Sequence, residues 1–122
     1  MSREPLIAVI DDDEPFRVAL VDSLCSLSYR ACGFASTKEF FAAGARTSCD
    51  CVITDIQMPG MSGFDLMRLL MARDWRIPVI MITARREPGL EAKAAASGAI
   101  CLLRKPFGAE DLMGHLKKAL EG

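Results

Sequence analysis

The chain has 122 residues, with 15 lysines and arginines against 16 aspartates and glutamates and a formal net charge of −1. A chain of this length can bury one core of its own, so we expect a single domain spanning residues 1–122. The near balance of charges provides no broad basic surface. We therefore expect no direct binding of nucleic acid or of an anionic membrane by this segment.

Cysteine use and the length of the apolar runs restrict the compartment. The five cysteines include no C-x-x-C pair, which favours neither a disulfide framework nor a zinc site. The longest apolar runs fall far short of the ~20 residues of a membrane-spanning helix. The N-terminus also lacks the charged and apolar regions of a signal peptide. We expect a soluble protein of the reducing cytoplasm.

Five short aliphatic runs alternate with five longer segments of helical period. This alternation predicts an α/β fold of (βα)₅ type, in which five parallel strands form a doubly wound sheet. The strands expected at about 6–10, 51–55 and 78–83 are apolar throughout, as is typical when helices cover both faces. Right-handed crossovers favour the strand order 2-1-3-4-5, the flavodoxin-like or CheY-like arrangement.

The helical segments differ in how firmly they should be held. Ser36 with Glu39, and Ser62 with Asp65, have the spacing of an N-cap hydroxyl and an acid that satisfy free amides. They predict the starts of the second and third helices. The fourth segment, about 88–97, has an apolar face made almost entirely of alanine. An alanine face buries less apolar area against its sheet than a leucine face does, so we expect this helix to be the one most easily displaced.

Polar side chains follow four of the predicted strands. Asp11 and Asp12 come after the first strand, Asp55 closes the third, and Thr83 and Lys105 follow the fourth and fifth apolar runs. The carboxyl ends of parallel strands open onto one crevice, so these side chains should meet. Two carboxylates ~4 Å apart repel by about 4 kcal/mol at an effective dielectric of 20, so three of them require a proton or a cation. Magnesium, which prefers oxygen ligands, is the simpler answer.

The residue types at this crevice suit phosphoryl chemistry. A carboxylate such as Asp55 can act as a nucleophile toward phosphorus and form an aspartyl phosphate. Lys105 could bind phosphoryl oxygens as a point charge, and Thr83 could donate a hydrogen bond to one of them. The neighbouring acids Asp13 and Glu14 are better interpreted as a solvated helix start.

Five separate blocks of the sequence resemble, in the right order, the receiver domain of two-component response regulators. The resemblance covers essentially the whole chain. Within the family, the chain is most similar to receivers of FixJ/LuxR-type transcriptional regulators. The blocks are Val9-Ile10-Asp11-Asp12, residues 55–63 (Asp-Ile-Gln-Met-Pro-Gly-Met-Ser-Gly), Thr83-Ala84, Gly98-Ala99 and Lys105-Pro106-Phe107.

The resemblance implies a phosphoacceptor and a metal site. Asp55 would take a phosphoryl group from a histidine of a sensor kinase or phosphotransfer protein. Asp12 and Asp55 would bind Mg²⁺ directly, with Mn²⁺ as a substitute, and Asp11 would bind it largely through water. Gln57 would contribute only its backbone carbonyl, so its side chain should matter little for the metal.

The resemblance also implies a switch rather than an enzyme, with self-catalysed phosphotransfer and autodephosphorylation as its only reactions. Thr83 would turn toward the phosphoryl group and Lys105 would pair with it. A cis peptide is expected between Lys105 and Pro106. The output surface would comprise the fourth helix, the fifth strand and the fifth helix, through which a homodimer could form.

The sequence departs from the family where its signal is transmitted. Leu102 stands where most receivers carry Tyr or Phe, so the resemblance implies no aromatic ring that moves behind the threonine here. Cys101 and Arg104 also replace residues that are commonly acidic, which makes this edge more basic together with Arg85 and Arg86.

Other functions have less support in the residues. A degenerate receiver that binds proteins without phosphorylation is the alternative, although such a module would usually have lost an acid or the lysine. An aspartate-nucleophile phosphatase would need an acid where Gln57 stands, and a flavin module would need a Gly-, Ser- and Thr-rich loop at 11–14. Whether a DNA-binding output domain follows Gly122 in a longer protein stays open at this point.

Overall fold

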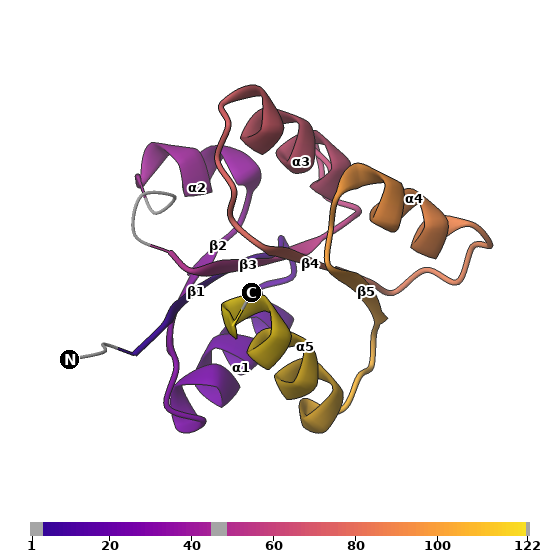
Figure 1. Ribbon diagram of the computed structural model, residues 1–122. Coiled ribbons are helices and arrows are strands. Elements are labelled where there is room, and N and C mark those ends of the chain that lie inside the picture. Colours follow the sequence, from indigo (N-terminus) through magenta and orange to yellow (C-terminus); the bar gives the residue numbers. More distant parts are fainter. Residues whose placement is uncertain (1–3, 45–48, 122) are drawn as a thin grey trace.

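The chain forms a five-stranded parallel sheet with helices on both faces (Figure 1). The computed structural model describes residues 4–44 and 49–121, so the expected domain limits at 1 and 122 lie outside the described residues. The sheet order is β2-β1-β3-β4-β5, which confirms the predicted topology. The elements are β1 (Leu6–Ile10), α1 (Glu14–Ser26), β2 (Arg30–Phe34), α2 (Thr37–Ala42), β3 (Cys51–Asp55), α3 (Gly63–Ala72), β4 (Val79–Thr83), α4 (Leu90–Ser97), β5 (Cys101–Arg104) and α5 (Ala109–Glu121).

Two layers of helices enclose the sheet. Helices α1 and α5 lie on one face, and α2, α3 and α4 lie on the other (Figure 1). Alternate residues of each strand supply the two cores: Ile7 packs toward α1 and α5, whereas Ala8 packs toward α2 and α3. Every residue of β3 and β4 is buried, as the continuous apolar runs predicted for central strands.

The predicted helix caps are present. The Ser62 hydroxyl accepts a hydrogen bond from the Asp65 amide, and the Asp65 carboxylate accepts one from the Ser62 amide, which completes a capping box. The Ser36 hydroxyl accepts from the Glu39 amide at 3.1 Å. The Glu39 carboxylate departs from the capping-box pattern, because it accepts a hydrogen bond from the amide of Ala35, the residue before the N-cap Ser36, at 3.4 Å.

Helix α4 has the small buried face that its alanines predicted. Leu90 and Ala94 are its buried residues, against five in α3 and two each in α1 and α2. The helix begins two residues later than expected, because Gly89 has a φ of 89° that cannot belong to a right-handed helix. Its N-cap makes no side-chain hydrogen bond. Among the helices in the described part of the chain, none has the length and apolar character needed to cross a bilayer.

The buried cysteines should be chemically inert. Burial raises the pKa of Cys51 to about 12 and that of Cys49 to about 11, whereas Cys25 is exposed. Because the thiolate is the reactive form, we expect a maleimide at neutral pH to label Cys25 quickly and Cys49 and Cys51 only after unfolding. Peptide mass spectrometry over time measures this order, with the denatured protein as the control. Labelling of native Cys51 as fast as Cys25 would contradict this packing of β3.

Candidate functional site

Strand register brings the acidic residues together. Ile10 of β1 pairs with Thr54 of β3, so the residues that follow, Asp11 and Asp55, lie side by side at the carboxyl end of the sheet. One oxygen each of Asp11, Asp12 and Asp55 lies within 4.8 Å of the others. Asp11 is 0% and Asp55 8% exposed, whereas Asp12 faces solvent. The three carboxylates predicted as metal ligands therefore form one cluster, open on one side to water.

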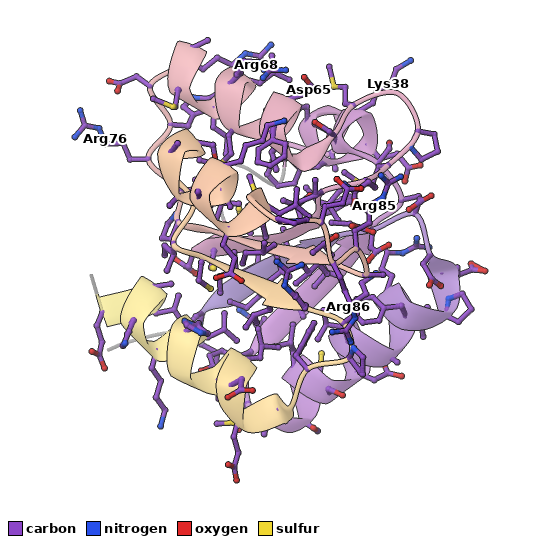
Figure 2. All side chains as sticks on the ribbon, turned by 90° about the vertical axis from the view of Figure 1, so that its right-hand side faces the viewer. Lys38, Asp65, Arg68, Arg76, Arg85 and Arg86 are labelled. Atoms are coloured by element: carbon purple, nitrogen blue, oxygen red, sulfur yellow. The ribbon has the colours of Figure 1, made fainter. Side chains whose placement is uncertain are left out.

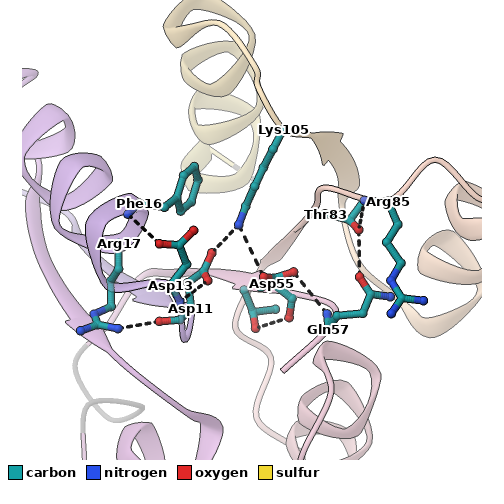
Figure 3. A network of polar contacts seen from close by, with 10 residues as sticks. Asp11, Asp13, Phe16, Arg17, Asp55, Gln57, Thr83, Arg85 and Lys105 are labelled. Atoms are coloured by element: carbon teal, nitrogen blue, oxygen red, sulfur yellow. Dashed lines mark hydrogen bonds and ion pairs between the residues drawn. The ribbon is translucent and has the colours of Figure 1, made fainter. Parts of the chain in front are cut away.

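Lys105 reaches this cluster from the end of β5. Its amide donates a hydrogen bond to the Thr83 carbonyl at 2.7 Å, which fixes its backbone beside β4. Its Nζ lies 2.8 Å from Asp11 Oδ2 and 3.5 Å from Asp55 Oδ2 (Figure 3). The same ammonium lies 4.0 Å from the centroid of the Phe16 ring. The peptide between Lys105 and Pro106 is cis, as expected.

The buried charges perturb one another. Burial, followed by the charge of Asp11, raises the pKa of Asp55, although Lys105 and the Gln57 amide oppose this rise. For Lys105, burial would lower the pKa, but the hydrogen bond to Asp11 and the charges of Asp55 and Asp11 outweigh it and raise the pKa. One ammonium thus faces two buried carboxylates and the nearby Asp12. The cluster therefore has more negative than positive charge, and its all-oxygen donors fit a hard dication such as Mg²⁺.

Thr83 is engaged in two hydrogen bonds beside the cluster. Its hydroxyl donates to Gln57 Oε1 at 3.0 Å and accepts from the Arg85 amide at 3.0 Å (Figure 3). The Gln57 amide in turn donates to Asp55 Oδ1 at 3.2 Å. Sequence reasoning missed the role of the Gln57 side chain as the partner of Thr83. The available signal was its position two residues after Asp55, in the loop that faces the end of β4.

The start of α3 holds the backbone of Asp55 in place. A Cβ on Gly63 would lie 2.9 Å from the Asp55 carbonyl oxygen and 3.2 Å from Ile56 Cα, so only glycine permits this close approach. The Gly63 amide also donates to the Ile56 carbonyl at 2.9 Å. The loop between β3 and α3 is therefore anchored at both ends around Asp55.

The start of α1 holds Asp11. Asp13 is the N-cap of α1, with its carboxylate accepting from the Phe16 amide at 3.2 Å, as its helix-start interpretation predicted. The Asp13 amide donates to Asp11 Oδ1 at 2.9 Å. Arg17, which sequence reasoning did not single out, donates from Nη1 to the Asp11 carbonyl at 2.7 Å (Figure 3). Asp11 is thus held by α1 on one side and by Lys105 on the other.

The surface beside the cluster is hollowed. A pocket of about 530 Å³ lies between the β3–α3 loop and α4, with Gln57, Met58 and Phe64 on one wall and Arg85 and Leu90 on the other. Two of its lining residues, Gln57 and Arg85, are hydrogen-bonded to the Thr83 hydroxyl. The pocket thus presents apolar groups together with the charged side chains of Arg85, Glu87 and Lys93.

Comparison with known proteins agrees with this geometry. Residues 7–117 match the family described as the response regulator receiver domain. The response regulator protein TmoT of Ectopseudomonas mendocina is 35% identical over 98% of this chain and 54% of its own length. The transcriptional regulatory protein FixJ of Azorhizobium caulinodans is 32% identical over 93% of this chain and 54% of its own length.

The fold has close counterparts among solved structures. The crystal structure of FixJ-N superimposes with a TM-score of 0.87 at 27% identity, covering 98% of this chain and 96% of that one. The chain spans about half the length of curated relatives such as TmoT and FixJ. The family match covers nearly all of the chain, and the fold and strand-end acids agree with it. The chain therefore belongs to the response regulator receiver domain family of two-component systems.

Proposed function

We propose that Asp55 is the phosphoacceptor of this receiver, within one functional domain spanning residues 1–122. The observation that carries the proposal is a buried carboxylate 3.5 Å from an ammonium and within a cluster of two further acids. Burial and the charge of Asp11 raise the pKa of Asp55, so the metal-free site disfavours its ionised form. A bound dication would restore the carboxylate that must attack phosphorus.

The metal ligands that we propose are Asp12 and Asp55 directly, Asp11 largely through water, and the backbone carbonyl of Gln57. The group would be Mg²⁺, or Mn²⁺ in its place, and it would neutralise charge that develops on the phosphoryl oxygens. The exposure of Asp12 supports this assignment, because Mg²⁺ keeps several waters in its shell. The bonds from Arg17 and Lys105 to Asp11 would hold that residue in place for the metal.

Thr83 and Lys105 are the proposed contacts of the phosphoryl group. Lys105 already lies between Asp11 and Asp55, where an added phosphoryl group would become a further anionic partner. The Thr83 hydroxyl would exchange its bond to Gln57 for one to a phosphoryl oxygen. Through this exchange, phosphorylation would change the hydrogen bonding of Thr83 at the end of β4.

We infer the partners from the family. The phosphoryl group would come from a histidine of a sensor kinase or phosphotransfer protein, with the histidine nitrogen as the leaving group. The output surface would be formed by α4, β5 and α5, through which a homodimer could also form. The protein would act in the cytoplasm as a switch whose only reactions are phosphotransfer to itself and autodephosphorylation.

Incubation with a small phosphodonor such as acetyl phosphate tests this proposal. With Mg²⁺ present, intact mass spectrometry should detect the gain of one phosphoryl group by the wild type and by Asp22→Asn, an exposed aspartate of α1. Asp55→Asn should gain none, and a chelator should abolish the gain in the wild type. A gain that persists in Asp55→Asn would exclude Asp55 as the acceptor. Absence of any gain, with no Mg²⁺ binding, would support the alternative of a phosphorylation-independent binding module.

A further inference from the structure

A chain of hydrogen bonds leads from the site to the first turn of α4. The Thr83 hydroxyl, bonded to Gln57, accepts from the Arg85 amide. The Arg85 carbonyl accepts from Arg104 Nη1 at 2.6 Å. Arg104 Nη2 lies 3.4 Å from the carboxylate of Glu91, the second residue of α4. The guanidinium of Arg104 therefore joins the loop after β4 to the helix that follows it.

Strand register explains why Arg104 can reach both partners. Arg104 pairs with Thr83 in the ladder between β4 and β5. It shares a strand face with Leu102, two residues earlier, and Leu102 packs on the core that includes Ala94 of α4. The Arg104 side chain is 29% exposed and extends along the loop toward the start of α4. Leu102 thus belongs to the core on which α4 packs, and Arg104 contacts the first turn of that helix.

The guanidinium is suited to this bridging position. Its planar donors can bind two acceptors at once in fixed geometry, which a lysine ammonium does less well. The ion pair with Glu91 is weak by itself, because the Glu91 side chain is 74% exposed. The bond to the Arg85 carbonyl is charge-assisted and short, so it ties the guanidinium to the loop whose Arg85 amide is bonded to the Thr83 hydroxyl. Displacement of that loop therefore moves the group that contacts α4.

Few other contacts hold the start of α4. Leu90 and Ala94 are its only buried residues among those described, and Gly89 provides no side-chain cap. Lys93 lies 4.6 Å from the Phe64 ring centroid, which ties α4 to α3 without involving Thr83. An element with so few buried contacts shifts at low cost in free energy. A single bridge to its first turn can thus bias its position.

We propose that Arg104 is the positioning residue through which the state of Thr83 reaches α4 in this chain. The inference rests on the proposed function. When the Thr83 hydroxyl leaves Gln57 for a phosphoryl oxygen, the Arg85 amide that is bonded to it moves too. The Arg104 guanidinium carries that movement from the Arg85 carbonyl to Glu91. The Arg104 bridge thus takes the transmitting role of the aromatic side chain that Leu102 replaces in this chain.

Amide hydrogen exchange with peptide resolution tests the bridge in four proteins. They are the wild type, Arg104→Gln, Arg76→Gln and Lys93→Gln. Arg76→Gln removes the same charge as Arg104→Gln, but Arg76 lies on the opposite side of the view from Arg85 (Figure 2). Among the salt bridges of the described residues, Arg76 pairs only with the exposed Asp74. Lys93→Gln loosens α4 without touching Arg104. Without a phosphodonor, Arg104→Gln should speed exchange in α4 by roughly threefold to tenfold, and Arg76→Gln should leave it unchanged.

The decisive comparison follows phosphorylation with Mg²⁺ and acetyl phosphate. Intact mass should show that all four proteins gain a phosphoryl group, because Arg104 does not touch the acidic cluster in the described contacts. Exchange in α4 should change on phosphorylation in the wild type, Arg76→Gln and Lys93→Gln, and should not change in Arg104→Gln. A response in Arg104→Gln equal to that of the wild type would overturn the inference, as would an unresponsive α4 in the phosphorylated wild type. A wild type that gains no phosphoryl group would overturn the proposed function itself, and the inference with it.

Discussion

Lys105→Met should lower the free energy of unfolding of the metal-free protein by about 3 kcal/mol, as is typical when one partner of a buried ion pair is removed. The ammonium compensates both Asp11 and Asp55, and its side chain is only 15% exposed. Methionine has an unbranched apolar side chain of similar length, so the loss reports mainly on the ammonium charge, including its contact with the Phe16 ring. Urea unfolding in the presence of a chelator measures the effect.

Two further proteins make this result specific. Lys117→Met, which replaces an exposed lysine of α5, should change stability by less than about 0.5 kcal/mol. Lys105→Met combined with Asp55→Asn should recover part of the loss, because one of the uncompensated carboxylates is then neutral. Mg²⁺ should also recover part of it by supplying positive charge. A Lys105→Met protein as stable as the wild type would show that the ammonium does not compensate the acids.

Asp55→Asn should stabilise the metal-free protein by on the order of 1 kcal/mol at neutral pH, since it removes a charge that burial and Asp11 disfavour. The sign follows from the pKa. The folded-state pKa of Asp55 lies above its ordinary value of 3.8, so protonation favours the folded state. This contribution to stability is present below pH 3.8 and is lost as the pH rises through the folded-state pKa. The advantage of the asparagine variant should therefore grow with pH from about 4 upward.

Unfolding curves at several pH values, in chelator and then in Mg²⁺, measure this prediction. A metal that binds the folded state stabilises it by mass action, so Mg²⁺ should stabilise the wild type more than Asp55→Asn. Asp22→Asn is the control that changes an exposed aspartate. If Asp55→Asn were less stable than the wild type in chelator at neutral pH, the described repulsion at the cluster would be wrong.

Much of the site could be predicted because it depends on topology. The crossover rule gives the strand order, and the order places the residues at the carboxyl ends of β1, β3, β4 and β5 at one edge. Asp11, Asp55 and Lys105 needed no further information to be brought together. The small buried face of α4, which comprises Leu90 and Ala94, was likewise predictable from its alanines.

What could not be predicted depends on side-chain conformation. The sequence places Gln57 near Asp55, but it does not decide that the amide turns to Thr83. The same holds for Arg104, whose place just after the fifth apolar run was evident but whose two acceptors come from backbone and helix geometry. The start of α4 was misplaced by two residues because Pro88 and Gly89 are both compatible with a helix start until the φ of Gly89 is known.

The most direct measurement locates the phosphoryl group itself. An aspartyl phosphate is an acyl phosphate, which borohydride reduces to the alcohol, so the modified aspartate becomes homoserine. After incubation with acetyl phosphate and Mg²⁺, peptide sequencing by mass spectrometry should find homoserine at position 55 and aspartate at positions 11, 12 and 13. Homoserine at any of these three positions, with aspartate retained at 55, would contradict the assignment of Asp55 as the phosphoacceptor.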